Sequence, residues 1–598
     1  MNHPQDENVG VEMSDARTAG DTSPRSEDAG NGGVSRRSFL GTVVSAGAAA
    51  AILPDVLATK EVQADIDPSL ARRLLENGTG AGALRGRRRA NEAFEVRLRA
   101  AGIARRVDIP AHPDNGDEEL FRSRIGNFSK GLPHNDFGEV DGGAYLSFLR
   151  AVRSGDPDDF ERIASGAPAD QRNLLVNPQS GLAFDLEGTD AHQLAIPPAP
   201  RFSSAQEAGE IVENYWMALL RDVAFDSYAT NPVAQAAAAE LSELSDFRGP
   251  KVNGRVTAQT LFRESVPGAL EGPYLSQFFL LPVPFGAQSV EPRVRTTAPG
   301  LDFMITQPSW LAIQNGFLPT QSEVFDPTLR YIRNGRDLSA FVHIDVLFQA
   351  YFNAFLILLQ PPLPSDPVRS GLGAPVNMGN PYLDSRNQTG FVTFGPPYFA
   401  GLVTEVATRA LKAMWYEKWF VHRRLRPEAF GGAIHQRLAR GRGYPIHPDA
   451  LESDAVARTL AQNGTYLLPQ AFPEGSPVHP AYGAGHAVVA GACVTILKAV
   501  FDESFVIESP VVATADGTAT TPYNGPEVLT VGGELNKIAV NVSIGRNIAG
   551  VHWRTDGIES MRLGEAVAIG VLRDQRLLYN ETFSGFTFTK FDGSLCTI

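Results

Sequence analysis

The sequence predicts a mainly α-helical protein with a few short β-hairpins. Three observations lead to this fold class. Apolar residues recur at helical spacing over several long segments. Segments rich in Val, Ile and Thr are short and few, and Pro- and Gly-rich connections separate the helical segments. At 598 residues the chain exceeds the usual size of one core, so two or more packed units are expected.

The composition is that of a globular protein, with 43% hydrophobic and 20% charged residues. A formal net charge of −14 argues against nucleic acid as a partner. Beyond the leader, no apolar run reaches the ~20 residues of a membrane span, so no membrane partner is expected. Only Cys493 and Cys596 could pair, and a small buried hydrophobe is the simpler interpretation of Cys493. No disulfide framework is expected.

Residues 1–65 are predicted to be a leader. Residues 1–35 are rich in Gly, Asp, Glu and Ser, which is typical of disorder. Arg36-Arg37 then precedes Ser-Phe-Leu and an Ala-rich apolar run to Pro54, the pattern of a twin-arginine export signal. The alternative is a chance Arg-Arg pair before an apolar helix. The pattern predicts a periplasmic or extracellular protein.

Residues 66–370 are predicted to form a mostly helical N-terminal region. Ser203-Ser204-Ala-Gln-Glu supplies capping chemistry for one helix, and Gln360-Pro361-Pro362 ends another. Helices are expected over 68–106, 205–228, 231–244 and 341–359.

Residues 371–598 are predicted to be the helical domain that carries the chemistry. It follows a Pro- and Gly-rich crossing over 361–395. A hairpin is expected within 505–530, around Asp516-Gly517. Helices are expected over 401–425, 487–501, 536–544 and 557–578.

The first chemical segment lies in residues 411–426. On a continuous helix, one stripe would carry Trp415, Lys418, His422 and Arg426. Several potential cations beside a Trp are unusual on an otherwise apolar face. A solvated basic face is the alternative for Lys418 and Arg426, and it is the preferred interpretation of Arg423 and Arg424.

The second segment is His479-Pro-Ala-Tyr-Gly-Ala-Gly-His486, which leads directly into the apolar helix from Ala487. A helix N-terminus offers unpaired N–H groups and positive potential to an anion. Gly485 allows close approach of the backbone, and His486 can donate to or accept from the anion.

In the third segment, Arg546 and His552 flank Gly550, and Asp556 follows His552 by one turn. An Asp at that spacing can hold one imidazole nitrogen and leave the other facing a metal. Three other histidines have no such neighbouring residues in sequence and are interpreted as structural or surface residues: His422, His435 and His447.

These segments carry a family resemblance. Lys418 to Arg426-Pro427, Gly485-His486 and Arg546-x5-His552-x3-Asp556 resemble the signature of the vanadium-dependent haloperoxidases. The type 2 phosphatidic acid phosphatase group shares it. The resemblance covers about residues 395–575, and the sequence around Lys418 is most similar to that of the red-algal bromoperoxidases.

The resemblance implies a bundle of helices that holds orthovanadate. It implies that His552 binds vanadium, and that the vanadate oxygens are bound by Lys418, Arg426, Arg546 and the Gly485 N–H. His486 would serve as acid and base toward hydrogen peroxide. Lys418 would polarise the bound oxidant, and Trp415 would pack beside the site. His479 stands where algal bromoperoxidases carry His, so bromide, with iodide, is the expected halide. Hypohalous acid would then halogenate small organic acceptors.

The sequence departs from the family pattern at two positions. Ala484 and Gly545 stand where the family usually has Ser. Loss of one charge-assisted hydrogen bond costs roughly 1.5–3 kcal/mol, so a working but slower enzyme is expected.

Two alternatives remain open from the residues alone. An acid phosphatase would use His552 as a nucleophile that forms a phosphohistidine, with His486 protonating the leaving group. A binding or shell-forming protein with a decayed site is the other. The resemblance also implies a homo-oligomer, with a dodecamer as one expectation. It further suggests a structural calcium ion, for which Asp366 is one of several candidate ligands.

Overall fold

The computed structural model describes residues 81–598, with the backbone alone for residues 81–85 and Arg87. The predicted leader over 1–65 lies outside the described residues. Contacts divide the chain at Ala93/Phe94, within helix α5 (Ala81–Ala104). The compact unit Phe94–Ile598 contains the bundle and all the site residues described below. The boundary expected between residues 370 and 371 stays a prediction.

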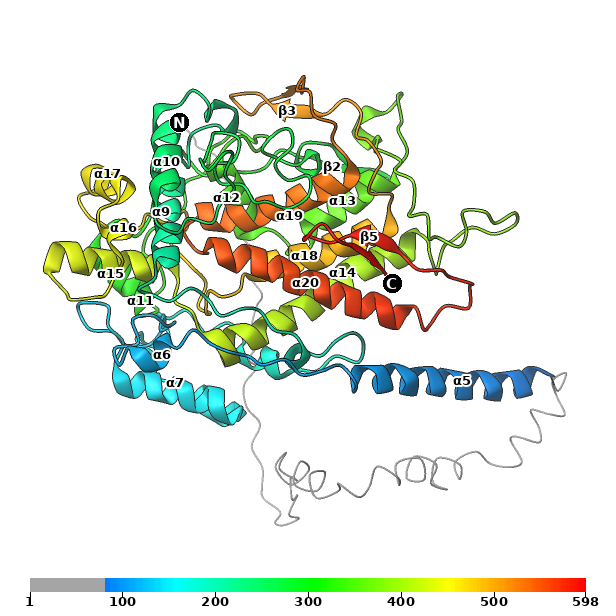
Figure 1. Cartoon of the computed structure of the whole chain (residues 1–598), viewed down its shortest axis with the longest axis horizontal. Coiled ribbons are helices and arrows are strands. Elements are labelled where there is room, and N and C mark those ends of the chain that lie inside the picture. Colours follow the sequence, from blue (N-terminus) through cyan, green and yellow to red (C-terminus); the bar gives the residue numbers. More distant parts are fainter. Residues whose placement is uncertain (1–80) are drawn as a thin grey trace, which may run out of the picture. The chain divides into compact units, whose positions relative to one another are not determined.

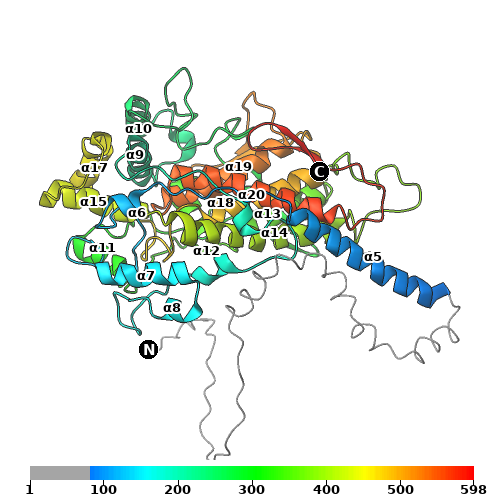
Figure 2. The ribbon, with the colours of Figure 1, turned by 60° about the horizontal axis from the view of Figure 1, so that its bottom comes forward.

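Four helices of the C-terminal third form the central bundle (Figures 1 and 2). They are α14 (Pro396–Tyr416), α18 (Gly485–Val500), α19 (Val531–Ile548) and α20 (Arg554–Gln575). Helix α18 packs against the other three. It is buried along almost its whole length because its residues are nearly all apolar, as the prediction over 487–501 required. The mainly α-helical fold class is confirmed.

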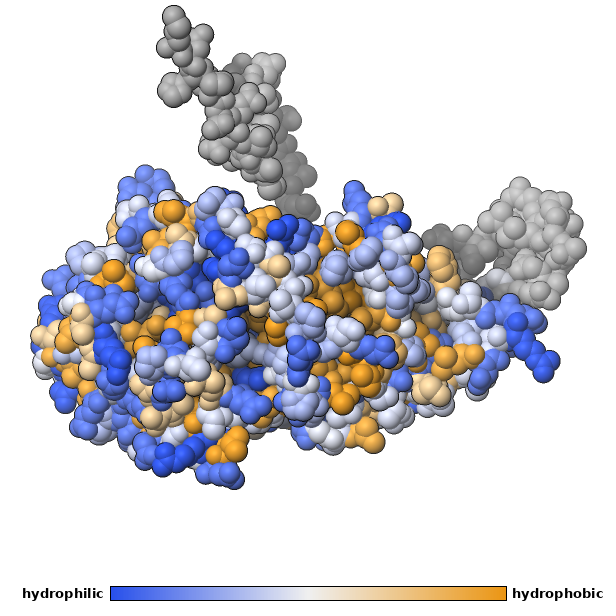
Figure 3. Space-filling model, turned by 90° about the horizontal axis from the view of Figure 1, so that it is seen from above, coloured by the Kyte–Doolittle hydropathy of each residue, from blue (hydrophilic) through white to orange (hydrophobic). Residues whose placement is uncertain are grey.

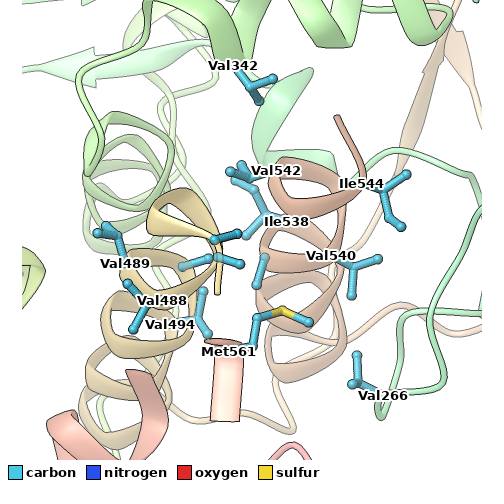
Figure 4. Close-up of a cluster of buried hydrophobic side chains, with 14 of the residues drawn as sticks. Val266, Val342, Val488, Val489, Val494, Ile538, Val540, Val542, Ile544 and Met561 are labelled. Carbon is cyan, nitrogen blue, oxygen red and sulfur yellow. The ribbon is translucent and has the colours of Figure 1, made fainter. Parts of the chain in front are cut away.

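Glycines allow α18 and α20 to pack backbone to backbone. A Cβ on Gly491 would lie 2.1 Å from the Met561 carbonyl oxygen, and a Cβ on Gly564 would lie 2.1 Å from that of Val488. Branched side chains of α18 and α19 fill the space beside this contact, and Met561 reaches between them (Figure 4). The close approach fixes the N-terminus of α18 relative to the start of α20. Both ends contribute to the site.

The N-terminal elements surround this bundle. Ser204 caps α9 by accepting a hydrogen bond from the Glu207 N–H, as the capping pattern predicted. The helices are α6 (Asp117–Leu120), α7 (Gly142–Ser154), α8 (Pro157–Glu161), α9 (Ala205–Leu219), α10 (Pro232–Glu243), α11 (Gln307–Gln314), α12 (Gly335–Ile344) and α13 (Gln349–Leu359). Short 3-10 helices lie at Pro178–Leu182, Ala191–Gln193, Phe225–Ser227, Gln277–Phe279 and Pro367–Arg369.

The single helix predicted over 341–359 is wrong. Helices α12 and α13 meet at 99° across a break of four residues. Asp345, the first residue of the break, has an extended conformation (φ −67°, ψ 150°), which ends α12. Apolar periodicity continued through the break and concealed it.

The helix predicted over 401–425 is also only partly correct. Helix α14 ends at Tyr416, and a π-helical turn continues from Glu417 to His422. Arg423 then adopts a left-handed conformation (φ 46°), and α15 (Pro427–Arg440) begins with Pro427 at its first position. The remaining helices of this half are α16 (Pro448–Leu451) and α17 (Asp454–Asn463).

The strands form three separate antiparallel hairpins: β1 (Val283–Phe285) with β2 (Gln288–Val290), β3 (Val511–Ala513) with β4 (Thr520–Pro522), and β5 (Thr587–Thr589) with β6 (Leu595–Thr597). The β3–β4 hairpin turns at Asp516-Gly517, as predicted, and Gly517 supplies the positive φ of 68°. Cys493 is buried, Cys596 is partly exposed, and both are free.

Within residues 81–598, no single helix combines the length and apolar character of a membrane span, although the bent pair α12–α13 meets the criteria jointly. The face that carries β2 and β3 displays several apolar patches among hydrophilic residues (Figure 3).

Candidate anion and metal site

Three cations lie in the interior of the bundle. Lys418 stands on the π-helical turn, Arg426 at the N-cap of α15 and Arg546 near the end of α19. Each is at most 5% exposed. Lys418 Nζ donates to the carbonyls of Pro480 and Ala481, at 2.8 and 3.0 Å. Arg546 donates from Nη1 to the Val342 carbonyl at 2.7 Å, and its buried Nε has no hydrogen-bond partner.

No carboxylate of the described chain forms an ion pair with Lys418, Arg426 or Arg546. Burial therefore lowers the pKa of Lys418 well below its usual value, lowers that of Arg426 to about 9 and lowers that of Arg546 to about 10. Uncompensated buried charges are costly. The arrangement is thus one that a bound anion would stabilise strongly.

His552 is oriented by its neighbours on both sides. Its Nδ1 lies 2.7 Å from Asp556 Oδ2, the contact predicted from their spacing. Its Nε2 lies 2.9 Å from Arg426 Nη1 and so faces the cations. Burial lowers the pKa of His552 well below its usual value, with a further contribution from Arg426. The imidazole is therefore neutral, the form that binds a metal.

The N-terminus of α18 faces the same region. Within residues 81–598, no hydrogen-bond acceptor is present for the N–H groups of Gly485, His486 and Ala487. A Cβ on Gly485 would lie 3.2 Å from Trp415 Cζ3, so glycine allows the tight packing there. The free N–H groups and the helix dipole add to the positive potential of the three cations.

His486 has a partner that the sequence did not reveal. Its Nε2 lies 2.8 Å from Asp345 Oδ1, in the break between α12 and α13. Burial lowers the pKa of His486, and the neighbouring Asp345 opposes that shift. Asp345 is 141 residues away in sequence and lies in a segment that had been predicted to be helical. No local signal could have identified it.

His479 and Trp415 lie beside Arg426. Arg426 Nη2 is 2.9 Å from His479 Nδ1, and the His479 ring is centred 4.9 Å from that of Trp415. Burial, with the nearby Lys418 charge, lowers the pKa of His479 well below its usual value. His479 is therefore a neutral, buried residue beside Arg426 and Trp415.

The interpretation of Arg423 and Arg424 as a solvated face is wrong. Arg424 is 1% exposed because the π-helical turn and the left-handed Arg423 rotate it into the bundle. It donates to Glu207, to Glu210 at 3.1 Å and to Asp556 at 2.9 Å. Arg423 is paired with Glu118 instead. Arg424 thus connects α9 to the carboxylate that holds His552.

The residues predicted to share one helix face therefore lie on two different elements. Lys418 and Arg426 approach the same site from the π-helical turn and from α15 rather than from one helix face. π-helical turns are frequent at functional sites because they redirect side chains within a helix. His422, the other potential cation of the predicted stripe, has its Nε2 3.0 Å from Glu417.

Comparisons with known proteins identify the family of this chain. A family model described as the VCPO second helical-bundle domain matches residues 401–581. The vanadium-dependent bromoperoxidase of Corallina officinalis is 38% identical, over 85% of this chain and 98% of its own length. That of Ascophyllum nodosum is 34% identical, over 82% and 93%. The chain belongs to the vanadium-dependent bromoperoxidase family.

A solved structure of the family has the same fold. It is the homohexameric second vanadate-dependent bromoperoxidase (AnII) of Ascophyllum nodosum. The TM-score is 0.79 at 33% identity, over 85% of this chain and 90% of that one. The similarity therefore extends well beyond the signature segments.

The two departures from the family signature have different surroundings. A Cβ on Gly545 would lie 3.0 Å from Leu338 Cγ and 3.2 Å from Val342 Cγ2, so α12 packs where a serine side chain would stand. Ala484, by contrast, already carries a Cβ at the N-cap of α18. Its N–H donates to Ser560 Oγ at 2.8 Å.

The residues present fit vanadate, the cofactor named for this family. Three uncompensated cations, the unpartnered Arg546 Nε and the free N–H groups of α18 suit its oxygens. His552 Nε2 offers the metal a neutral nitrogen. For calcium, the described residues contain no group of three or more His, Cys, Asp or Glu arranged for a metal. Asp366 accepts a hydrogen bond from Arg369 at 2.6 Å.

Proposed function

We propose that this protein uses vanadate to oxidise bromide, and iodide, with hydrogen peroxide to hypohalous acid, which halogenates small organic acceptors. The observation that carries the proposal is the set of three buried cations, Lys418, Arg426 and Arg546, that lie near His552 Nε2 and form no ion pair with a carboxylate of the described residues. The curated relatives, named vanadium-dependent bromoperoxidases, support the same reaction. Phosphoester hydrolysis is not favoured by these relatives.

Bound vanadate supplies a Lewis-acid centre at which hydrogen peroxide is activated toward halide. His552 would bind the vanadium through Nε2, while Asp556 holds its Nδ1 proton. Lys418, Arg426 and Arg546 would bind the oxygens, and their positive charge would stabilise negative charge that develops there. The Gly485 N–H would add a neutral donor from the helix end.

His486 is the residue we assign to proton transfer. Asp345 accepts a hydrogen bond from its Nε2 side, so Nδ1 is directed elsewhere and can exchange a proton with peroxide. Lys418 would polarise the bound oxidant. His479 and Trp415 form an aromatic wall next to Arg426, where halide preference would be set.

The decisive experiment compares protein dialysed against EDTA with the same protein given orthovanadate. Bromination of a phenol-based dye by hydrogen peroxide is expected only with vanadate. The Lys418→Ala variant should lose this activity. Turnover of a phosphomonoester that vanadate inhibits, without bromide oxidation, would establish the phosphatase alternative instead.

Three further properties belong to the proposal. The homohexameric relative supports a homo-oligomer, and native mass spectrometry would distinguish a hexamer from a dodecamer. Export through the twin-arginine route is expected from Arg36-Arg37, and replacement of both by Lys should retain the protein in the cytoplasm. A structural calcium would be detected by elemental analysis of protein purified without chelator.

A further inference from the structure

A surface hollow lies against the vanadate site but is not part of it. Its volume is about 250 Å³, and its walls come from the β1–β2 hairpin with the segments before and after it, from α12 and from the start of α13. Asp345 is one of the wall residues. Because Asp345 also contacts His486, a single side chain separates the hollow from the proposed proton-transfer residue.

The walls of the hollow are mainly apolar and aromatic. Phe279 and Phe341 meet edge to face, with ring centroids 5.0 Å apart. Ile344 lies at the rim and is 69% exposed, so its side chain is accessible from solvent. An enclosed apolar space of about 150 Å³ is already enough to bind benzene in another protein. The hollow therefore has room for one substituted aromatic ring.

The charges around the hollow leave one acceptor free. Glu291 and Arg293 neutralise each other at 2.8 Å. The guanidinium of Arg295 stacks on Phe325, 3.7 Å from the ring centroid. Asp345 uses Oδ1 for His486, and within residues 81–598 its Oδ2 has no hydrogen-bond donor. The hollow thus combines aromatic walls with one carboxylate oxygen that can accept a hydrogen bond.

We propose that this hollow binds the organic acceptor of the halogenation, and that the acceptor is a small phenol. Its ring would pack against Phe279 and Phe341, and its hydroxyl would donate to Asp345 Oδ2. A phenol has a pKa of about 10 and so keeps its proton at neutral pH. The inference rests on the proposed function, because that reaction supplies the halogenating agent.

The chemistry at this position balances without a further reagent. The O–Br bond of hypobromous acid breaks, and a C–Br bond forms on the ring carbon. The ring carbon loses its proton to the departing hydroxide, which leaves as water. The ring carbon is oxidised and the bromine is reduced. A phenol held beside the site would be brominated before hypobromous acid diffuses away.

Binding is tested first on vanadate-free protein, by ¹⁹F NMR with 4-fluorophenol as the probe. We expect a saturable shift or broadening with the wild type. The Ile344→Glu variant should weaken binding about tenfold or more, because it places a charge at the apolar rim. Val346→Glu is the matched control. Val346 is 56% exposed, lies two residues away and is not in the wall, so binding should be unchanged.

The second arm separates this inference from the proposed function. Bromide oxidation without an acceptor, followed as tribromide, should be equal in wild type, Ile344→Glu and Val346→Glu. The KM for a phenol should rise about tenfold in Ile344→Glu alone. Absence of tribromide from the vanadate-loaded wild type would contradict the proposed function, and the NMR arm would still test the hollow.

A competition experiment completes the test. When a phenol and an alkene compete, the enzyme should favour the phenol more than free hypobromous acid does, and Ile344→Glu should abolish that preference. A product ratio equal to that of the free reagent would overturn the inference. So would 4-fluorophenol binding that is not saturable, or that is the same in Ile344→Glu.

Discussion

Replacement of Asp556 by Asn should weaken vanadate binding without removing any group that contacts the anion. Asp556 Oδ2 lies 2.7 Å from His552 Nδ1 and 3.1 Å from the Trp553 N–H, and Oδ1 accepts from Arg424 at 2.9 Å. All three neighbours require an acceptor. An amide of the same shape offers one oxygen and one NH₂ group. If the NH₂ group faces His552, the imidazole proton must move to Nε2, which can then no longer bind a metal.

The other orientation of the amide is no better. Its oxygen would satisfy His552, but its NH₂ group would then face the Arg424 guanidinium, donor against donor. Changes at the partner of a metal-bound histidine typically reduce metal affinity roughly 10- to 100-fold, or about 1.4–2.7 kcal/mol. The dissociation constant of orthovanadate, measured by equilibrium dialysis of purified protein, should rise by that factor.

Asp574→Asn is the matched control. Asp574 is also buried on α20, and it accepts the Gly188 N–H at 2.7 Å far from the site. Asp574→Asn should leave vanadate affinity unchanged, whereas Asp556→Asn should lower vanadate affinity and also the melting temperature, because buried Arg424 loses one of its carboxylates. An unchanged dissociation constant in Asp556→Asn would show that His552 needs no carboxylate to select its tautomer, and would refute the positioning role assigned to Asp556.

Three other outcomes are expected. Ala484→Ser should raise vanadate affinity or bromide-oxidation rate about ten- to hundredfold, by adding one charge-assisted donor; unaltered kinetics would show that the hydroxyl is dispensable. Burial opposes the charge on His343, yet hydrogen bonds to Glu323 and Glu474 raise its pKa to about 9. The stability that charged His343 contributes is complete below the pKa of about 6.5 that histidine has in the unfolded chain. It is lost as pH rises through the folded-state pKa of about 9. The difference in melting temperature between wild type and His343→Gln should therefore narrow between these two pH values. Orthovanadate at a hundred times its dissociation constant should stabilise the folded state by about 2.7 kcal/mol, seen as a higher melting temperature that phosphate reproduces only weakly.

The elements predicted well are those for which local pattern and tertiary packing agree. The apolar run after His486 can only be a buried helix, and α18 occupies Gly485–Val500. The hydrogen bond between His552 and Asp556 was predicted from their spacing of four residues, and it forms across the start of α20, because His552 precedes the N-cap Trp553. The β3–β4 hairpin follows from the conformational preference of Asp516-Gly517.

The elements predicted poorly depend on distant contacts. The break at Asp345 interrupts an apolar pattern, and the carboxylate placed there contacts His486, 141 residues away in sequence. The π-helical turn at Glu417–His422 has no distinct sequence signal, since it differs from an α-helix by one added residue. Both irregularities lie at the site, where local preference gives way to the position that the chemistry requires.

Arg424 and Arg426 show most clearly what the sequence could not supply. They are two residues apart, both are buried, and either could have been taken for an anion ligand. Arg424 contacts three carboxylates, which raise its pKa despite burial. Arg426 contacts none, and burial lowers its pKa to about 9. A cation already surrounded by carboxylates gains little from vanadate, whereas an uncompensated one gains much. The distribution of carboxylates, brought to the site by α9 and α20, therefore determines which arginine is available to an anion and which one holds Asp556.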